Sequence, residues 1–101
     1  MAFKIIVKPI VWWDLEEAIT WYESERSGLG WDFFIHFEEA KERVLANPNA
    51  YQIIIPGVRR ILIRKFPYKI FYTISENSIF LIGLIHAKRS NAFIRKRLKT
   101  L

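Results

Sequence analysis

The spacing of apolar residues changes near the middle of this chain, and that change limits the folds open to it. Before residue 50, apolar side chains recur every three or four residues, as on one face of an α-helix. From Tyr51 onward they alternate or form short runs, as in β-strands. A chain of 101 residues has room for one domain. We therefore expect a single α+β domain over residues 1–101.

Turn and capping residues divide the two halves into elements. Residues 3–7 alternate and predict a strand that Pro9 ends. Two amphipathic helices follow, the second over residues 31–46, with the turn 27–30 between them. Residues 52–55 form a short apolar run before a turn, strands are predicted at 58–65, 68–75 and 78–87, and a short helical turn at 93–98 has exposed cations. The order β-α-α-β-β-β predicts a two-helix hairpin on one face of an antiparallel sheet, with the other face free.

Charge is distributed as unevenly as the apolar pattern. Residues 1–50 carry a net charge of −4, whereas residues 51–101 carry +10. Such asymmetry favours a face for a polyanion or an acidic protein, and a solvated basic surface is an equally good explanation. The absence of cysteine fits a reducing cytoplasm, and neither a signal peptide nor an apolar run of membrane-spanning length is present. We expect a cytoplasmic protein that does not enter a membrane.

His86 is the first candidate for chemistry, because Lys88 and Arg89 follow it closely at the end of the last predicted strand. A histidine near cations can act as a general acid or base in RNA cleavage. A histidine that bonds the backbone and orders the strand end is the favoured alternative. Strict alternation would place His86 on the same face as Leu84 and Ile82.

Basic and aromatic residues of the second half are the other candidates. Arg60 and Arg64 would lie on one strand face roughly 13 Å apart, a spacing that suits successive phosphates or protects an edge strand. Arg59, on the opposite face, would pair with a helix acid. Tyr68 follows Pro67 and is expected either to stack on a base or to pack in the core.

The remaining unusual residues are interpreted as structural. His36 is expected to be solvent-exposed, and Trp12 and Trp13 to pack at the core or its rim, with an exposed patch as the alternative. The two histidines lie far apart, so no metal-ligand spacing is present, and no phosphate-binding glycine loop occurs. We expect no cofactor.

Taken in order, these motifs resemble the RelE/ParE toxins of type II toxin–antitoxin modules, and the resemblance runs nearly end to end. Its residues are Asp14-Leu15-Glu16-Glu17-Ala18, Trp21-Tyr22-Glu23, Gly28-Leu29-Gly30, Phe34, Asn47-Pro48, Tyr51, Val58-Arg59-Arg60, Phe66-Pro67-Tyr68, Tyr72 and His86-Ala87-Lys88-Arg89. The resemblance implies a curved antiparallel sheet on a helical hairpin. It also implies a cognate acidic antitoxin, whose charge would complement the basic half.

The resemblance leaves the target open. RelE-like members cut messenger RNA on the ribosome with basic residues and a Tyr or His near the C-terminus, but here neither type follows His86, and Phe93 and Leu98 stand there instead. The turn at Pro67 and the ending at Arg89 are more like the ParE branch, whose studied members poison DNA gyrase without cutting anything themselves.

Three hypotheses follow, and enzymatic activity is expected only under the second. The first is a growth-inhibiting gyrase poison of a plasmid-stabilisation-type module, the second a ribosome-dependent mRNA endoribonuclease, and the third a non-toxic basic module that binds RNA or protein. The catalytic candidates for a nuclease are His86, Arg89 and Tyr68. The target-binding candidates are Arg60, Arg64, Lys65, Lys88, Arg89 and Arg97. The oligomeric state is not predicted.

Overall fold

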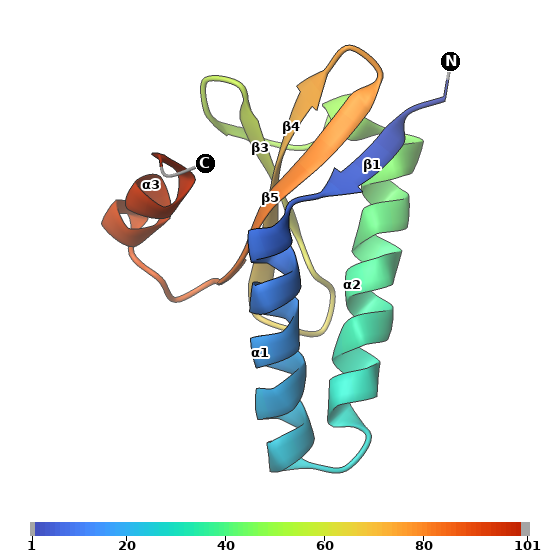
Figure 1. The fold of residues 1–101 in the computed structure, drawn as a ribbon, viewed down its shortest axis with the longest axis vertical. Helices are drawn as coiled ribbons and strands as arrows, with labels where there is room; N and C mark the ends of the chain where they lie inside the picture. Colours follow the sequence, from blue (N-terminus) through green and yellow to red (C-terminus); the bar gives the residue numbers. More distant parts are fainter. Residues whose placement is uncertain (1, 100–101) are drawn as a thin grey trace.

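A computed structural model describes residues 2–99 of the chain. The elements are β1 (Lys4–Val7), α1 (Pro9–Glu25), α2 (Leu29–Ala46), the 3-10 helix η1 (Pro48–Ala50), β2 (Ile53–Ile55), β3 (Val58–Leu62), β4 (Tyr68–Ser75), β5 (Ser78–His86) and α3 (Asn91–Lys99). The predicted α+β fold and the order of its elements are confirmed, with β2 as an additional strand after the hairpin and α3 as an additional full helix (Figure 1). None of the helices within residues 2–99 is long and apolar enough to cross a membrane.

The five strands form one sheet in the order β1-β5-β4-β3-β2. The neighbours β5, β4, β3 and β2 are antiparallel, but β1 runs parallel to β5, with Lys4 opposite Ser78. The sheet is therefore mixed and not wholly antiparallel. A parallel pair needs a long crossover connection, which the helical hairpin and β2–β4 supply here. Sequence alternation in β1 carries no information about the direction of its neighbour.

The two long helices lie side by side because the turn between them is built for close approach (Figure 1). A Cβ added at Gly30 would lie 2.8 Å from the Ile19 carbonyl oxygen, so only glycine fits there. The Glu23 carboxylate accepts hydrogen bonds from the backbone N–H groups of Gly28 and Gly30 at 3.0–3.1 Å. A carboxylate at a helix N-terminus satisfies otherwise unpaired donors and the positive end of the helix dipole.

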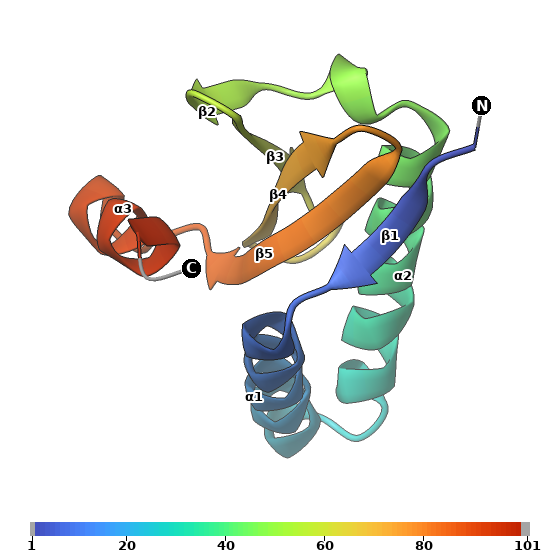
Figure 2. The ribbon, with the colours of Figure 1, turned by 45° about the horizontal axis from the view of Figure 1, so that its top comes forward.

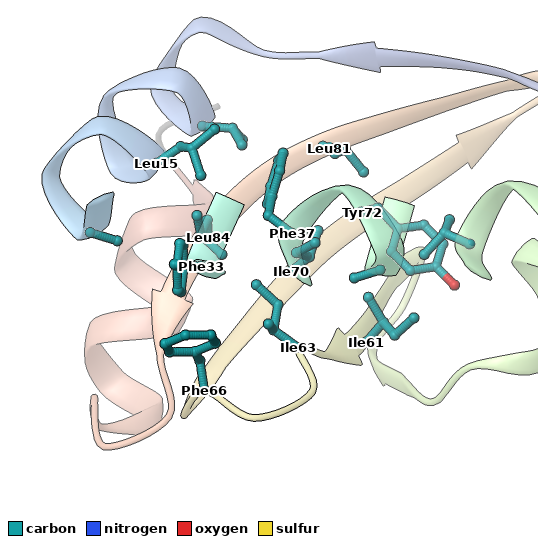
Figure 3. Packing of buried hydrophobic residues seen from close by; sticks show 14 of the residues in the cluster. Leu15, Phe33, Phe37, Ile61, Ile63, Phe66, Ile70, Tyr72, Leu81 and Leu84 are labelled. Carbon is teal, nitrogen blue, oxygen red and sulfur yellow. The ribbon is translucent and has the colours of Figure 1, made fainter. Parts of the chain in front are cut away.

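The main core lies between this hairpin and one face of the sheet. Figure 3 shows Phe33 and Phe37 of α2 packed together with Leu15 of α1 and the strand residues Ile70 and Leu84. Tyr72 is fully buried, and its hydroxyl donates to the Pro48 carbonyl oxygen at 2.8 Å. Burial raises the pKa of Tyr72 to about 12. This bond fastens η1 to the middle of the sheet.

The opposite face of the sheet is not free, contrary to the sequence-based prediction. α3 lies against it, away from the hairpin (Figure 2), and Ile94 is buried in a second cluster with Phe71, Ile82 and Ile85. Leu98 packs against the same cluster. The predicted helical turn is thus an amphipathic helix docked through two aliphatic residues.

A β-bulge in β5 changes which residues face the helices. Phe71 lies opposite Gly83 and Tyr72 opposite Leu81, so Ile82 is an extra residue on β5. Leu84 consequently lies in the main core, whereas Ile82 lies in the cluster beneath α3. The expectation that Ile82 shares a face with His86 is therefore wrong, because alternation fails across a bulge.

Candidate functional site

The candidate site is a cleft at the end of β5, between α1 and α3, and it consists of three adjoining cavities. The central pocket, of about 70 Å³, is lined by Asp14, Glu17, Tyr68, Leu84, Ile85, His86, Arg89, Phe93 and Arg97. On one side, the α3-side pocket of about 640 Å³ runs between α1 and α3. On the other, the Trp21-side pocket of about 650 Å³ lies among Glu17, Trp21, Tyr68, His86, Lys88 and Arg89.

Strand pairing brings the predicted catalytic residues His86, Tyr68 and Arg89 together. Tyr68 lies directly opposite His86 in the β4–β5 ladder, and their rings meet edge to face at 5.0 Å between centroids. The Lys88 backbone N–H donates to His86 Nδ1 at 3.0 Å, and the Arg89 N–H donates to the His86 carbonyl oxygen at 3.1 Å. A nitrogen that accepts a hydrogen bond bears no proton, so a neutral His86 carries its proton on Nε2. The ring thus orders the turn after β5, and its role in chemistry stays a prediction.

Tyr68 is held in its protonated form. Burial raises the pKa of its hydroxyl, and the nearby Tyr22 and Glu17 raise it further, while Arg89 opposes them. A tyrosine with a raised pKa donates hydrogen bonds at neutral pH and is a poor general base. Tyr68 is therefore suited to orienting an acceptor in the cleft.

Asp14 joins three elements at the inner wall of the cleft. Its Oδ1 and Oδ2 accept hydrogen bonds from Arg97 Nη2 at 2.5 and 2.6 Å. Its Oδ2 also accepts a hydrogen bond from the backbone N–H of Leu84 at 3.1 Å. From α1, this one side chain therefore bonds to both β5 and α3, in addition to the apolar packing of Leu15, Ile94 and Leu98. Arg97, expected to be exposed, is instead only 20% exposed and ion-paired. Docking of α3 removes water from this side of the helix, so a cation there needs an ion-pair partner to compensate for its lost hydration.

The cleft has an acidic wall and an aromatic rim that sequence reasoning missed. Trp13, Glu17 and Trp21 succeed one another at four-residue spacing along α1, so they lie on one helix face. The Arg89 guanidinium stacks over the Phe93 ring at 4.5 Å. The four-residue spacing of Trp13, Glu17 and Trp21 in the sequence was the available signal for this shared face. Trp12 and Trp13 are 48% and 72% exposed, so the favoured packing at the core or rim is wrong and the alternative of an exposed patch is confirmed.

Arg64 and Lys65 do not join this site. β3 ends at Leu62, and both side chains turn back to α2, where Arg64 pairs with Glu39 at 2.9 Å and Lys65 with Asp32. Lys65 holds the pKa of the Asp32 carboxyl below its usual value. Arg60 and Arg64 therefore do not share a strand face at the expected spacing, because the strand stops between them.

The two arginines of β3, Arg59 and Arg60, also have local partners. Arg60 donates to the Gln52 side-chain oxygen at 2.9 Å. Arg59 donates to the backbone carbonyls of Asn49 and Tyr51 at 3.1 and 2.7 Å, and not to a helix acid as expected.

His36 is half-buried and bonds the Asp32 carbonyl oxygen at 2.8 Å, so its expected exposure is wrong. Within residues 2–99 no cluster of three or more His, Asp or Glu side chains is placed to hold a metal ion.

The fold, a helical hairpin on one face of a mixed sheet, is shared with solved structures of the E. coli RelE toxin and of a ParDE system. A chain of the chromosomal ParDE TA system from P. aeruginosa superposes with a TM-score of 0.76 at 14% identity, over 86% of this chain and 98% of that one. The mutant E. coli toxin RelE in the free state gives 0.72 at 16% identity, over 100% and 99%. The isolated E. coli RelE toxin gives 0.63 at 19% identity, over 99% and 100%. Neither the family models nor the curated proteins include a match. The shared fold confirms the expected RelE/ParE architecture.

Proposed function

We propose that this protein is the toxin of a type II toxin–antitoxin module and arrests growth in the cytoplasm, in a module of the plasmid-stabilisation type. Three observations support the proposal: the RelE/ParE fold, the net charge of +10 on residues 51–101, and a cleft at the end of β5 lined by His86, Tyr68 and Arg89. A cognate acidic antitoxin is the proposed partner. The groove of about 250 Å³ between α3 and β2–β3, with Arg60 and Arg95 in its lining, has the charge for an acidic segment.

DNA gyrase is the target we propose, and the acidic wall of the cleft carries this choice. Asp14 and Glu17 of α1 lie in the same pocket as His86 and Arg89. A carboxylate 4 Å from a phosphate is repelled by about 1 kcal/mol in water and by several times more near a protein surface. Glu17 makes no ion pair within residues 2–99 and lies in the same pocket as His86, so it would repel a scissile phosphate there and offset part of the attraction of Lys88 and Arg89. A surface of gyrase that presents a lysine or arginine side chain to Glu17 would be attracted instead.

Ribosome-dependent mRNA cleavage is the second candidate, favoured by the convergence of Tyr68, His86, Lys88 and Arg89 on one cavity. These residues provide a donor, a candidate acid and cations for a phosphate. His86→Ala should then abolish transcript cleavage while the fold is kept.

Purified protein distinguishes the candidates. The gyrase proposal requires that it stabilise gyrase–DNA cleavage complexes, and that the matched variant Arg89→Ala do so less well than Arg43→Ala, which changes an arginine of α2 outside the cleft. Growth arrest without cleavage complexes would refute it, and new ends mapped in transcripts would then support the nuclease. Harmless expression without any antitoxin would favour the third hypothesis, a non-toxic binding module.

A further inference from the structure

α1 differs in composition from the rest of this basic protein. Within Pro9–Glu25 it has five acidic residues and no basic one, although the whole chain carries a net charge of +6. Its exposed surface also includes Trp12, Trp13 and Trp21, at 48%, 72% and 58% exposure. Large exposed aromatic side chains next to charged ones are typical of protein-binding surfaces. α1 thus combines apolar contact area with negative charge.

The α3-side pocket turns part of this surface into a cleft. Ile10 and Trp13 of α1 form one wall, and Phe93 of α3 contributes to the other. The pocket measures about 640 Å³, enough for a large apolar side chain and its flanking residues.

Some charged side chains around this pocket already have partners within the protein, and others do not. At its inner side the Arg97 guanidinium is bound to Asp14, and Arg89 lies over the Phe93 ring. Glu16 and Glu17 are exposed in its lining and make no hydrogen bond or ion pair within residues 2–99. Two carboxylates beside exposed indole and phenyl rings are available to a ligand. Both groups attract cations, the carboxylates by charge and the rings by cation–π interaction.

We propose that the α3-side pocket binds a basic segment of a partner protein. An apolar or aromatic side chain of the segment lies between Trp13 and Phe93, and its Lys or Arg residues face Glu16 and Glu17. This segment differs in charge from the acidic antitoxin segment, whose complement is the basic half of the chain. The inference does not depend on which cellular target the protein has.

Two labelled, end-capped octapeptides test the proposal, one alternating Leu with Arg and the other Leu with Glu. Fluorescence anisotropy with the whole protein should show binding of the Arg peptide, and Trp emission should shift to shorter wavelength as Trp13 loses contact with water. Trp13→Ala should weaken this binding roughly tenfold, since aromatic anchors dominate such interfaces. Glu16→Gln combined with Glu17→Gln should weaken it roughly three- to tenfold, with loss of its salt dependence.

Matched controls make the result specific to the pocket. Trp31 and Glu42 of α2 are exposed and lie outside the pocket lining, so Trp31→Ala and Glu42→Gln should bind the Arg peptide as the unchanged protein does. Circular dichroism melting checks that each variant folds. Absence of Arg-peptide binding overturns the proposal, as does equal weakening by the control and pocket variants. Sedimentation measures self-association of the protein and of Trp13→Ala. If the substitution changes only self-association, the proposal is overturned too, because the occupant of the pocket would then be a second copy of the chain.

Discussion

Replacing Asp14 by asparagine should release α3 from the sheet without unfolding the molecule. The side-chain amide of the variant keeps an oxygen that can accept the Leu84 N–H, but the substitution removes the charge that binds Arg97. Hydrogen bonds to charged groups contribute about 1.5–3 kcal/mol. With the two side chains 20% and 15% exposed, we take a loss near the middle of that range, about 2 kcal/mol.

Hydrogen exchange measures this loss directly. The amides of residues 95–99 are protected by docking of α3, and about 2 kcal/mol corresponds to roughly 30-fold faster exchange when local opening controls it. Amides of the main core, such as those of β4, should change far less. Asp14→Ala should additionally leave the buried Leu84 N–H without an acceptor, which costs a further ~1–3 kcal/mol and lowers the melting temperature of the whole domain.

Glu16→Gln is the control, since it removes a neighbouring charge of α1 that has no partner within residues 2–99. It should leave exchange in α3 within about twofold of the unchanged protein. If Asp14→Asn did the same, the ion pair would not hold α3, and the docking would have to come from Ile94 and Leu98 alone.

Three further predictions concern the fold. Glu76→Gly should raise stability by about 1 kcal/mol in thermal melts, because Glu76 lies exposed at φ 56° in the β4–β5 turn. A lower melting temperature would show that the turn does not strain glutamate. Gly30→Ala should cost about 1–3 kcal/mol, because its Cβ would lie 2.8 Å from the Ile19 oxygen; an unchanged denaturation midpoint would contradict that close approach. Asp32→Asn should lower the melting temperature at pH 7. Since Lys65 lowers the folded-state pKa of Asp32, this stabilisation is present above the usual pKa of 3.8 and is lost as pH falls through the folded value. The two melting curves should therefore converge in acid, and a constant difference would rule this linkage out.

Features set by local pattern could be predicted from the sequence, and features set by long-range contacts could not. Helical spacing indicated both long helices, and the predicted strands 68–75 and 78–87 agree with β4 and β5 to within one residue. The parallel pairing of β1 was missed, because alternation does not encode the identity of a neighbouring strand.

The same distinction applies to the cleft. The grouping of His86 with Arg89 followed from their closeness in sequence. The partners Asp14 and Arg97 are 83 positions apart, and no local pattern links them. Arg64 was misplaced because nothing in its alternating segment marks the end of β3 at Leu62.

The strand order also has a consequence for synthesis on the ribosome. β5 lies between β1 and β4, so the strand that is translated after the other four enters the interior of the sheet. Until residue 78 and those after it emerge, β1 has no neighbour, and the helical hairpin covers an incomplete sheet. The cleft draws its walls from α1, β4, β5 and α3 and is therefore the last part of the molecule to form. A nascent chain halted before β5 has neither the assembled core nor the His86 surface, so we expect partial products of this chain to be inert.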